Sequence, residues 1–322
     1  MPIDDGGIGE YVQGRWRAQG GFVVLKADLF RARISSNYCL KHKRKTVYMP
    51  SYRFCRPDDL QLIVTAVNAC YLLHYPDAEA LTEEHFKEHM TLFAVRPGNC
   101  MVALERQQPV GVVISARRDT QAWIQAIGCQ PAFQRRGIAS QLIEALIRKI
   151  AIQRTSEITV DVPEDNLPAV KFFERVAFNV HGCYVSYHGT LTKQHASPEA
   201  VTRATIGELL AAYAQFHPRP MCWERQAESL AAYGEVPQAY AYRPQGELWG
   251  YLVHRGSTIL DLAIAPHADA DQVSTTLLSA MAAAGITQAS IAKVPREDGL
   301  CAVLERRGFT QSGGHLLMGQ QL

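Results

Sequence analysis

Residues 134–139 have the composition of an anion-binding loop. They combine a glutamine, two arginines, Gly137, an isoleucine and Ala139, between a predicted strand ending at Cys129 and a predicted helix beginning at Ile138. Small residues let a ligand approach the backbone, and the first amides of a helix lack intrahelical partners. Because those amides lie at the positive end of the helix dipole, the stretch predicts a pyrophosphate site. The alternative is an ordinary strand-to-helix turn with exposed arginines.

A second stretch, residues 160–178, reads as a strand followed by Asn-x-x-Ala, an aromatic pair, Glu-Arg and Ala-Phe. Together with residues 126–139, it resembles the two signatures of the GNAT superfamily of N-acetyltransferases. In that family the first signature is Arg/Gln-x-x-Gly-x-Gly/Ala after a strand, and the second ends in Gly-Phe. The signatures occur in the family's order, with 32 residues between Gln134 and Asn166. The resemblance covers residues 48–190 well and residues 200–322 as a faint copy.

The resemblance implies acetyl-CoA as co-substrate, held mainly by backbone groups. It assigns the pantetheine arm to the strand end, the pyrophosphate to the loop and first helical turn, and further cofactor contacts to the second signature. The residues so implied are Ile127, Gly128, Cys129, Gln134, Arg135, Arg136, Gly137, Ile138, Ala139, Ser140, Asn166 and Phe173. Asn166 can also be the N-cap of a helix that starts at Leu167-Pro168, since proline suits a first turn.

The implied chemistry is direct attack of an amine on the acetyl-CoA carbonyl, which requires a proton acceptor. Asp161 stands where ribosomal-protein alanine acetyltransferases, which this region resembles, have a catalytic glutamate. The alternative for Asp161 is a carboxylate on a strand surface. Phe173 departs from the family, because many members have a tyrosine there that protonates the leaving thiolate. Tyr184 is the catalytic substitute we expect, with Tyr187 as a further candidate.

The order of predicted elements recurs after a polar linker at Gln194–Glu199. The second copy is predicted to have helices over residues 207–216 and 224–233 and a strand over residues 289–294. Val162-Pro163 matches Val294-Pro295, and residues 174–178 match residues 305–309. At the position of the anion-binding loop, residues 266–274 have no glycine and carry two aspartates that would repel phosphate. We therefore expect a degenerate second copy that does not bind CoA, in a tandem arrangement similar to that of mycothiol synthase.

Two other motifs suggest different functions. His85 and His89 form a His-x-x-Glu-His pattern, but no third metal ligand is evident and we expect no metal. Residues 41–45 are basic, yet so short a run is usually a solvated segment, so nucleic-acid binding is a weak alternative. A non-catalytic acyl-CoA-binding or sensor protein is the main alternative to an enzyme. His74, His217 and Trp223 lie where the resemblance places the acceptor site, and the alternative for each is a packed or surface role, which the sequence favours.

The candidate site residues must be positioned by strands and helices. The spacing of apolar residues predicts strands and helices that alternate along the chain. Apolar residues at helical spacing predict helices after Asp59, from Thr82 to Met90, and over Ile138–Ile152. Short apolar runs predict strands at residues 22–25, 47–54, 100–104, 110–115, 123–129, 158–162 and 184–188. The expected fold class is mixed α/β with a mixed sheet, built as two tandem GNAT-like domains.

Composition agrees with this picture. The 322 residues are 47% apolar and 20% charged, with net charge +2, and no apolar run approaches the ~20 residues of a membrane helix. The eight cysteines form no Cys-x-x-Cys pair, so we expect buried thiols in a soluble cytoplasmic protein. The predicted divisions are a basic extension over residues 1–46, a CoA-binding domain over 47–192 and the degenerate domain over 200–322.

Overall fold

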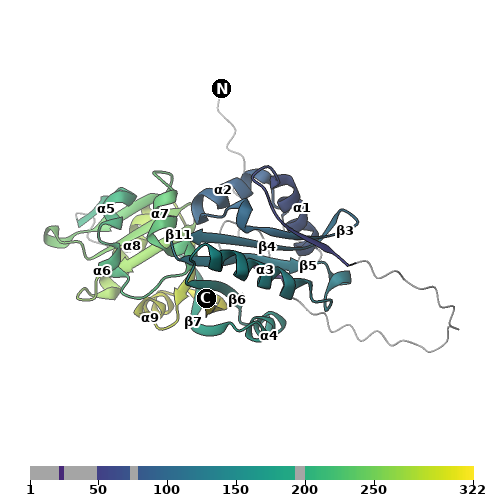
Figure 1. The fold of residues 1–322 in the computed structure, drawn as a ribbon. Helices are drawn as coiled ribbons and strands as arrows, with labels where there is room; N and C mark the ends of the chain where they lie inside the picture. Colours follow the sequence, from purple (N-terminus) through teal and green to yellow (C-terminus); the bar gives the residue numbers. More distant parts are fainter. Residues whose placement is uncertain (1–21, 25–48, 73–78, 193–199) are drawn as a thin grey trace, which may run out of the picture.

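The computed structural model describes residues 49–72, 79–192 and 200–322, and the backbone alone of strand β1 (Phe22–Val24). We call residues 49–192 the first half and residues 200–322 the second half. The two halves lie side by side around a single 13-stranded sheet (Figure 1). The His74 position and the basic residues 41–45 lie outside the described residues.

The first half alternates strands and helices as the apolar pattern predicts. Helix α3 covers the range expected for it, and its buried residues are the five apolar ones at helical spacing, Ile138, Leu142, Ile143, Leu146 and Ile150. Thr82 caps α2 by accepting from the His85 amide. The elements are β2 (Ser51–Phe54), α1 (Leu60–Tyr71), α2 (Glu83–Phe93), β3 (Met101–Glu105), β4 (Gln108–Arg118), β5 (Gln121–Cys129), α3 (Ile138–Ile152), β6 (Glu157–Pro163), α4 (Leu167–Arg175) and β7 (Asn179–Thr190).

The second half repeats this order. Gly111 on β4 and Gly250 on β10 occupy equivalent places, since a Cβ atom on either would collide with the helix above, at Ile138 and Val273 respectively. The elements are β8 (Val201–Arg203), α5 (Ile206–Leu210), α6 (Tyr213–Phe216), α7 (Ala227–Ala232), β9 (Gln238–Tyr242), β10 (Gly250–Arg255), β11 (Thr258–Ile264), α8 (Ala270–Ala283), β12 (Gln288–Pro295), α9 (Gly299–Arg306) and β13 (Thr310–Gln321).

The halves exchange their last strands. The sheet runs β2-β3-β4-β5-β6-β13-β7-β12-β11-β10-β9-β8, so β13 of the second half inserts between β6 and β7 of the first. In turn β7 pairs with β12 of the second half. The end of the described chain therefore lies at the junction of the halves (Figure 1). His315 of β13 pairs with Tyr184 of β7 near the middle of this exchange.

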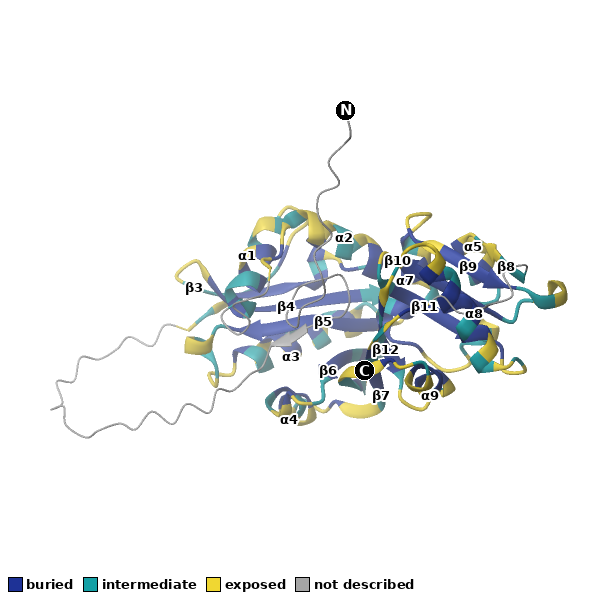
Figure 2. Ribbon diagram, turned by 180° about the vertical axis from the view of Figure 1, so that it is seen from behind, coloured by how far each residue is buried: buried dark blue, intermediate teal, exposed yellow. Residues whose placement is uncertain are grey.

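Three apolar clusters enclose the sheet, whose central strands are buried (Figure 2). One cluster continues across both halves on one face, joining residues of α1 and α2 to Leu230 and Tyr251 of the second half. On the other face, α3 and α4 cover the first half and α8 and α9 cover the second. The halves are thus joined by both a shared sheet and a shared core.

Some predicted boundaries were wrong. Strand β7 begins at Asn179, five residues before the predicted start. The two helices expected over residues 207–216 and 224–233 are each divided. Residues 211–212 form a turn between α5 and α6, and Gln226 is extended (ψ 155°) between the 3-10 turn Trp223–Arg225 and α7. No helix within the described residues is long and apolar enough to cross a membrane.

Candidate active site

A gap opens in the sheet between β5 and β6. These parallel strands pair only through Gln121–Ile124 and Glu157–Val160. Beyond that point β5 stays on β4, with a bulge at Gln125 of β5, while β6 stays on β13. Asp161 is the first residue of β6 after the last pair, so it stands at the vertex of the gap.

The predicted anion-binding loop follows β5 at the wide end of this gap. Gly137 is the N-cap of α3 with φ +78°, a conformation that glycine adopts without steric cost. A Cβ atom there would have no neighbour within 4 Å, so the space before the helix is open. Arg135 and Arg136 are exposed, but Arg136 folds back to donate to the Ala132 carbonyl at 2.8 Å. Backbone amides, rather than this side chain, are therefore the groups presented to an anion.

The edge of β5 that the resemblance assigns to pantetheine is paired with β1. Phe22, Val23 and Val24 run parallel to residues 126–128 of β5. The Ile127 and Cys129 side chains are buried, which leaves their backbones as the groups able to bind a ligand. Burial also raises the pKa of the Cys129 thiol to about 12, so this thiol is protonated.

The two site residues of the second signature, Asn166 and Phe173, lie in different surroundings. Asn166 is the N-cap of α4, and its Oδ1 accepts from the Ala169 amide at 3.3 Å, as the N-cap interpretation predicts. Phe173 does not fit the predicted cofactor contact. Its side chain is fully buried, with ring centroids of Phe172 and Phe178 each 5.1 Å away. This correction follows from the apolar side chain, which packs into the core under α4.

A cavity of about 430 Å³ lies between the halves, beside the vertex of the gap. This volume suits a small ligand. Its walls come from β5, β6 and β7 of the first half and, in the second half, from residues 219–223, Gln226, residues 295–297 and Leu317 of β13. Asp161, Tyr184 and Trp223, which sequence reasoning singled out separately, all line it.

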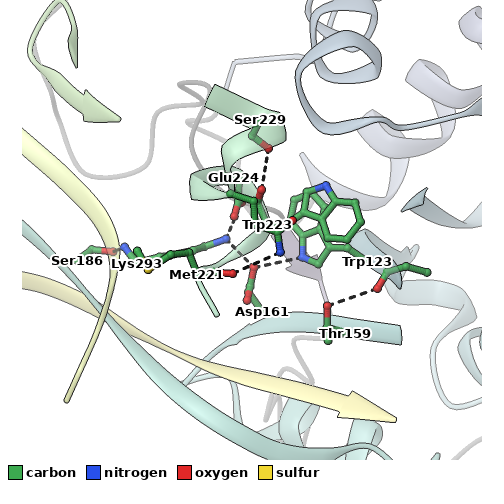
Figure 3. A network of polar contacts seen from close by, with 11 residues as sticks. Trp123, Thr159, Asp161, Ser186, Met221, Trp223, Glu224, Ser229 and Lys293 are labelled. Carbon is green, nitrogen blue, oxygen red and sulfur yellow. Dashed lines mark hydrogen bonds and ion pairs between the residues drawn. The ribbon is translucent and has the colours of Figure 1, made fainter. Parts of the chain in front are cut away.

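Asp161 is buried and held by groups from both halves (Figure 3). Its Oδ2 accepts from the Lys293 ammonium at 2.9 Å and from the Trp123 indole at 3.2 Å. Lys293 also donates to Glu224 Oε1 at 2.7 Å. The Asp161 Oδ1 atom has no hydrogen-bond partner among the described residues. The carboxylate therefore has one oxygen held by two donors and the other buried without a partner among the described residues.

The charges of this cluster act on one another. Burial raises the pKa of the Asp161 carboxyl, while Lys293 opposes the rise and Glu224 adds to it. Burial disfavours the Lys293 ammonium, but the two carboxylates outweigh this cost and raise the pKa of Lys293 above its usual value. The Lys293 ammonium is thus shared between two carboxylates, one from each half.

Of the two tyrosines, Tyr184 lines the cavity, and burial raises the pKa of its phenol, which therefore keeps its proton. Tyr187, which is also on β7, packs instead into the apolar core of the second half and donates to Glu305 Oε1 at 2.9 Å. The structure thus brings Tyr184 and Asp161 to one cavity and leaves Tyr187 outside its walls.

In the His-x-x-Glu-His motif, which suggested a metal site, His89 contacts a neighbouring side chain. His89 is partly buried, lies 3.1 Å from the Gln125 amide nitrogen, and has its pKa lowered to about 4 by burial. Within the described parts of the chain, no group of three or more His, Cys, Asp or Glu residues could hold a metal ion. His217 contacts Tyr251 and Asp261 of the second half.

The loop before α8 differs from the one before α3. Asp269 is the N-cap of α8 and its side chain accepts from the Gln272 amide. Asp271, in the first turn, pairs with Arg306 at 2.8 Å. A carboxylate therefore already occupies the helix end that holds an open glycine in the first half.

Sequence reasoning missed Lys293, Glu224 and Trp123. One signal was available, because Lys293 is a single charged residue inside the apolar strand predicted at residues 289–294. A charge within a buried strand needs a partner of opposite sign. The partner itself, 132 residues away, was not evident from local pattern.

Comparisons with known proteins identify the family of one part of this chain. Residues 61–178 match the model of the Acetyltransferase (GNAT) family. These residues form a GNAT acetyltransferase domain. The chain is also 27% identical over 132 residues to an acetyltransferase of Pectobacterium atrosepticum, a match that covers 41% of this chain and 89% of that protein.

Solved structures extend the GNAT likeness to both halves. A putative acetyltransferase of Pyrococcus horikoshii has a TM-score of 0.60 at 19% identity, over 87% of this chain and 93% of its own. A tandem GNAT protein of the clavulanic acid biosynthesis pathway has a TM-score of 0.55 at 14% identity, over 84% and 98% respectively. The predicted mixed α/β fold with two GNAT-like halves is therefore confirmed, and the chain carries an acetyltransferase domain.

Proposed function

We propose that this chain is an acetyl-CoA-dependent N-acetyltransferase that acts on a primary amine of a small molecule or peptide. The observation that carries the proposal is the Asp161 carboxylate, which stands at the vertex of the gap and on the wall of the cavity, with Oδ1 unpartnered among the described residues. A carboxylate oxygen in this state is suited to accept a proton from an amine nitrogen.

The residues around the gap fit acetyl-CoA. The amides that follow Gly137 would hold the pyrophosphate, and the backbone of residues 127–129 would hold the pantetheine arm, with Asn166 nearby. The open space in front of Gly137 supports this assignment, because a phosphate must approach the backbone there. Asp271 and the capping Asp269 favour one cofactor per chain, bound by the first half.

In the proposed reaction, the amine nitrogen attacks the thioester carbonyl, a C–N bond forms and the C–S bond breaks. Asp161 takes the amine proton, directly or through a water molecule. Tyr184 lines the same cavity and keeps its proton, so its phenol can donate a hydrogen bond to the departing thiolate. A thiolate with a pKa near 8–9 also leaves without help.

The test is an acetyl-transfer assay in which purified protein receives acetyl-CoA and a panel of amines, and free CoA is measured. With an amine that is turned over, we expect Asp161→Asn to lower kcat by about 100-fold or more, the usual weight of a general base. Calorimetry should show acetyl-CoA affinity nearly unchanged. Asp119→Asn, at an exposed turn, is the matched control.

A wild-type rate in Asp161→Asn would remove Asp161 from the mechanism. Acetyl-CoA binding without turnover of any amine would instead favour a non-catalytic acyl-CoA-binding protein.

A further inference from the structure

Lys293 occupies in the second half the position that Asp161 occupies in the first. Each residue directly precedes a Val-Pro pair at the end of a strand, β6 or β12. Pro163 pairs with His315 on β13, Pro295 pairs with Tyr184 on β7, and those two partners pair with each other. The exchanged strands thus relate the two positions by approximate twofold symmetry, and their side chains meet at the centre.

The chain holds Lys293 in an unusual conformation. Its φ is +53°, a left-handed angle that is uncommon for a residue other than glycine, and it lies where the register of β12 shifts between Ile291 and Val294. Its amide donates to Ser186 Oγ at 3.2 Å, and only 3% of its side chain is exposed. The surroundings therefore fix both its backbone and its ammonium.

We propose that Lys293 and Glu224 are positioning residues, supplied by the second half, that set the proton affinity of Asp161 and hold its carboxylate in the wall of the cavity. The inference rests on the proposed function and gives the degenerate half a part in catalysis. Lys293 lies 2.9 Å from Asp161 and 2.7 Å from Glu224, so it joins the two carboxylates (Figure 3). The ammonium favours ionised Asp161, and the second carboxylate opposes it.

Three further titratable groups lie around the cluster of Asp161, Lys293 and Glu224, and they are uncharged near neutral pH. Burial raises the pKa of the Tyr184 phenol and of the Cys222 thiol, so both keep their protons. Burial, followed by the charge of Lys293, lowers the pKa of His315 to about 4, which leaves this imidazole neutral. Among the described residues, Lys293 and Glu224 are therefore the charged groups that act directly on Asp161.

The test uses two substitutions with opposite expected effects on the full-length chain. Lys293→Met removes the favourable charge, so the acid limb of the kcat/KM profile should move to higher pH by about one unit or more. Glu224→Gln removes the opposing charge and should move the same limb to lower pH. Lys293→Arg keeps the charge and should leave the limb near its wild-type position. Lys149→Met, a substitution on α3 away from the cavity, is the control.

A second measurement does not require activity. In protein with ¹³C-labelled aspartate, the Asp161 carboxyl resonance, assigned by its loss in Asp161→Asn, should titrate with the same two opposite shifts. If these shifts occur but no amine is acetylated, the proposed function fails, while the control of Asp161 protonation by Lys293 and Glu224 is upheld. If acetylation proceeds and neither substitution moves the titration, or both move it in one direction, the inference is overturned. If Lys293→Met does not fold, the direction of the Glu224→Gln shift alone decides whether the inference holds.

Discussion

At the scale of single residues, Gly137 connects the sequence motif most directly to cofactor binding. It has φ +78° and open space where a side chain would begin. Gly137→Glu would place a negative charge in front of the amides proposed to hold pyrophosphate. We expect acetyl-CoA affinity to fall by about 100-fold or more, which corresponds to roughly 2.7 kcal/mol, measured by calorimetry.

Two controls separate charge from backbone strain at this site. Gly137→Ala brings only the cost of a left-handed angle, about 1–2 kcal/mol, and should reduce stability more than affinity. Gly207→Glu adds the same side chain in the first turn of α5, where a Cβ also meets open space, and should leave binding unchanged. Unchanged affinity in Gly137→Glu would contradict the phosphate assignment.

The residue scale also shows where sequence reasoning succeeds. Asn166 was predicted as an N-cap from the proline that follows it, and this prediction is confirmed because capping depends on neighbours in sequence. Phe173 was placed at the cofactor by family position, but an apolar ring is more stable in the core, where it packs. Lys293 depends on a partner in the other half, which no local signal identifies.

At the scale of elements, β1 and the proposed pantetheine arm use the same edge of β5. Strand β1 pairs with residues 126–128, and the resemblance assigns residues 127–129 to the cofactor. Val23→Pro removes a backbone N–H from β1 and should weaken its pairing. We expect acetyl-CoA to bind several-fold more tightly to this variant than to wild type, by calorimetry.

The matched control for this prediction is Ala18→Pro, which adds a proline outside β1 and should leave affinity as in wild type. Equal or weaker binding by Val23→Pro would show that β1 does not compete with acetyl-CoA.

The elements themselves were largely predictable. The α3 range follows from apolar residues at helical spacing, and β6 from a short apolar run between polar turns. Pairing was not predictable in the same way. Nothing in residues 310–321 indicates that this strand pairs with β6 rather than within its own half, because the partner is chosen by tertiary packing.

At the scale of the whole molecule, the exchange of β7 and β13 ties the halves together more strongly than a surface contact would. Side-chain hydrogen bonds also join the halves, because Arg118 of β4 donates to Gln226 at 2.7 Å and to Ser229 at 2.6 Å. A protease site inserted between Gln194 and Glu199 and then cut should therefore leave two fragments that co-elute in gel filtration.

Denaturant should be needed to separate these fragments, and the cut protein should keep its binding of acetyl-CoA. Two separate peaks without denaturant would mean that each half is stable with its own strands and that the exchange is dispensable.

The exchanged strand also imposes an order on synthesis at the ribosome. Strand β6 leaves the exit tunnel early, but its partner β13 is translated only after almost the whole second half. At roughly 5–20 residues per second, the nascent first half waits on the order of ten seconds with open strand edges. Such edges template wrong pairing between chains. A ribosome that stalls or stops before β13 should therefore release an aggregation-prone product, even though residues 61–178, which match the GNAT family model, have already been made.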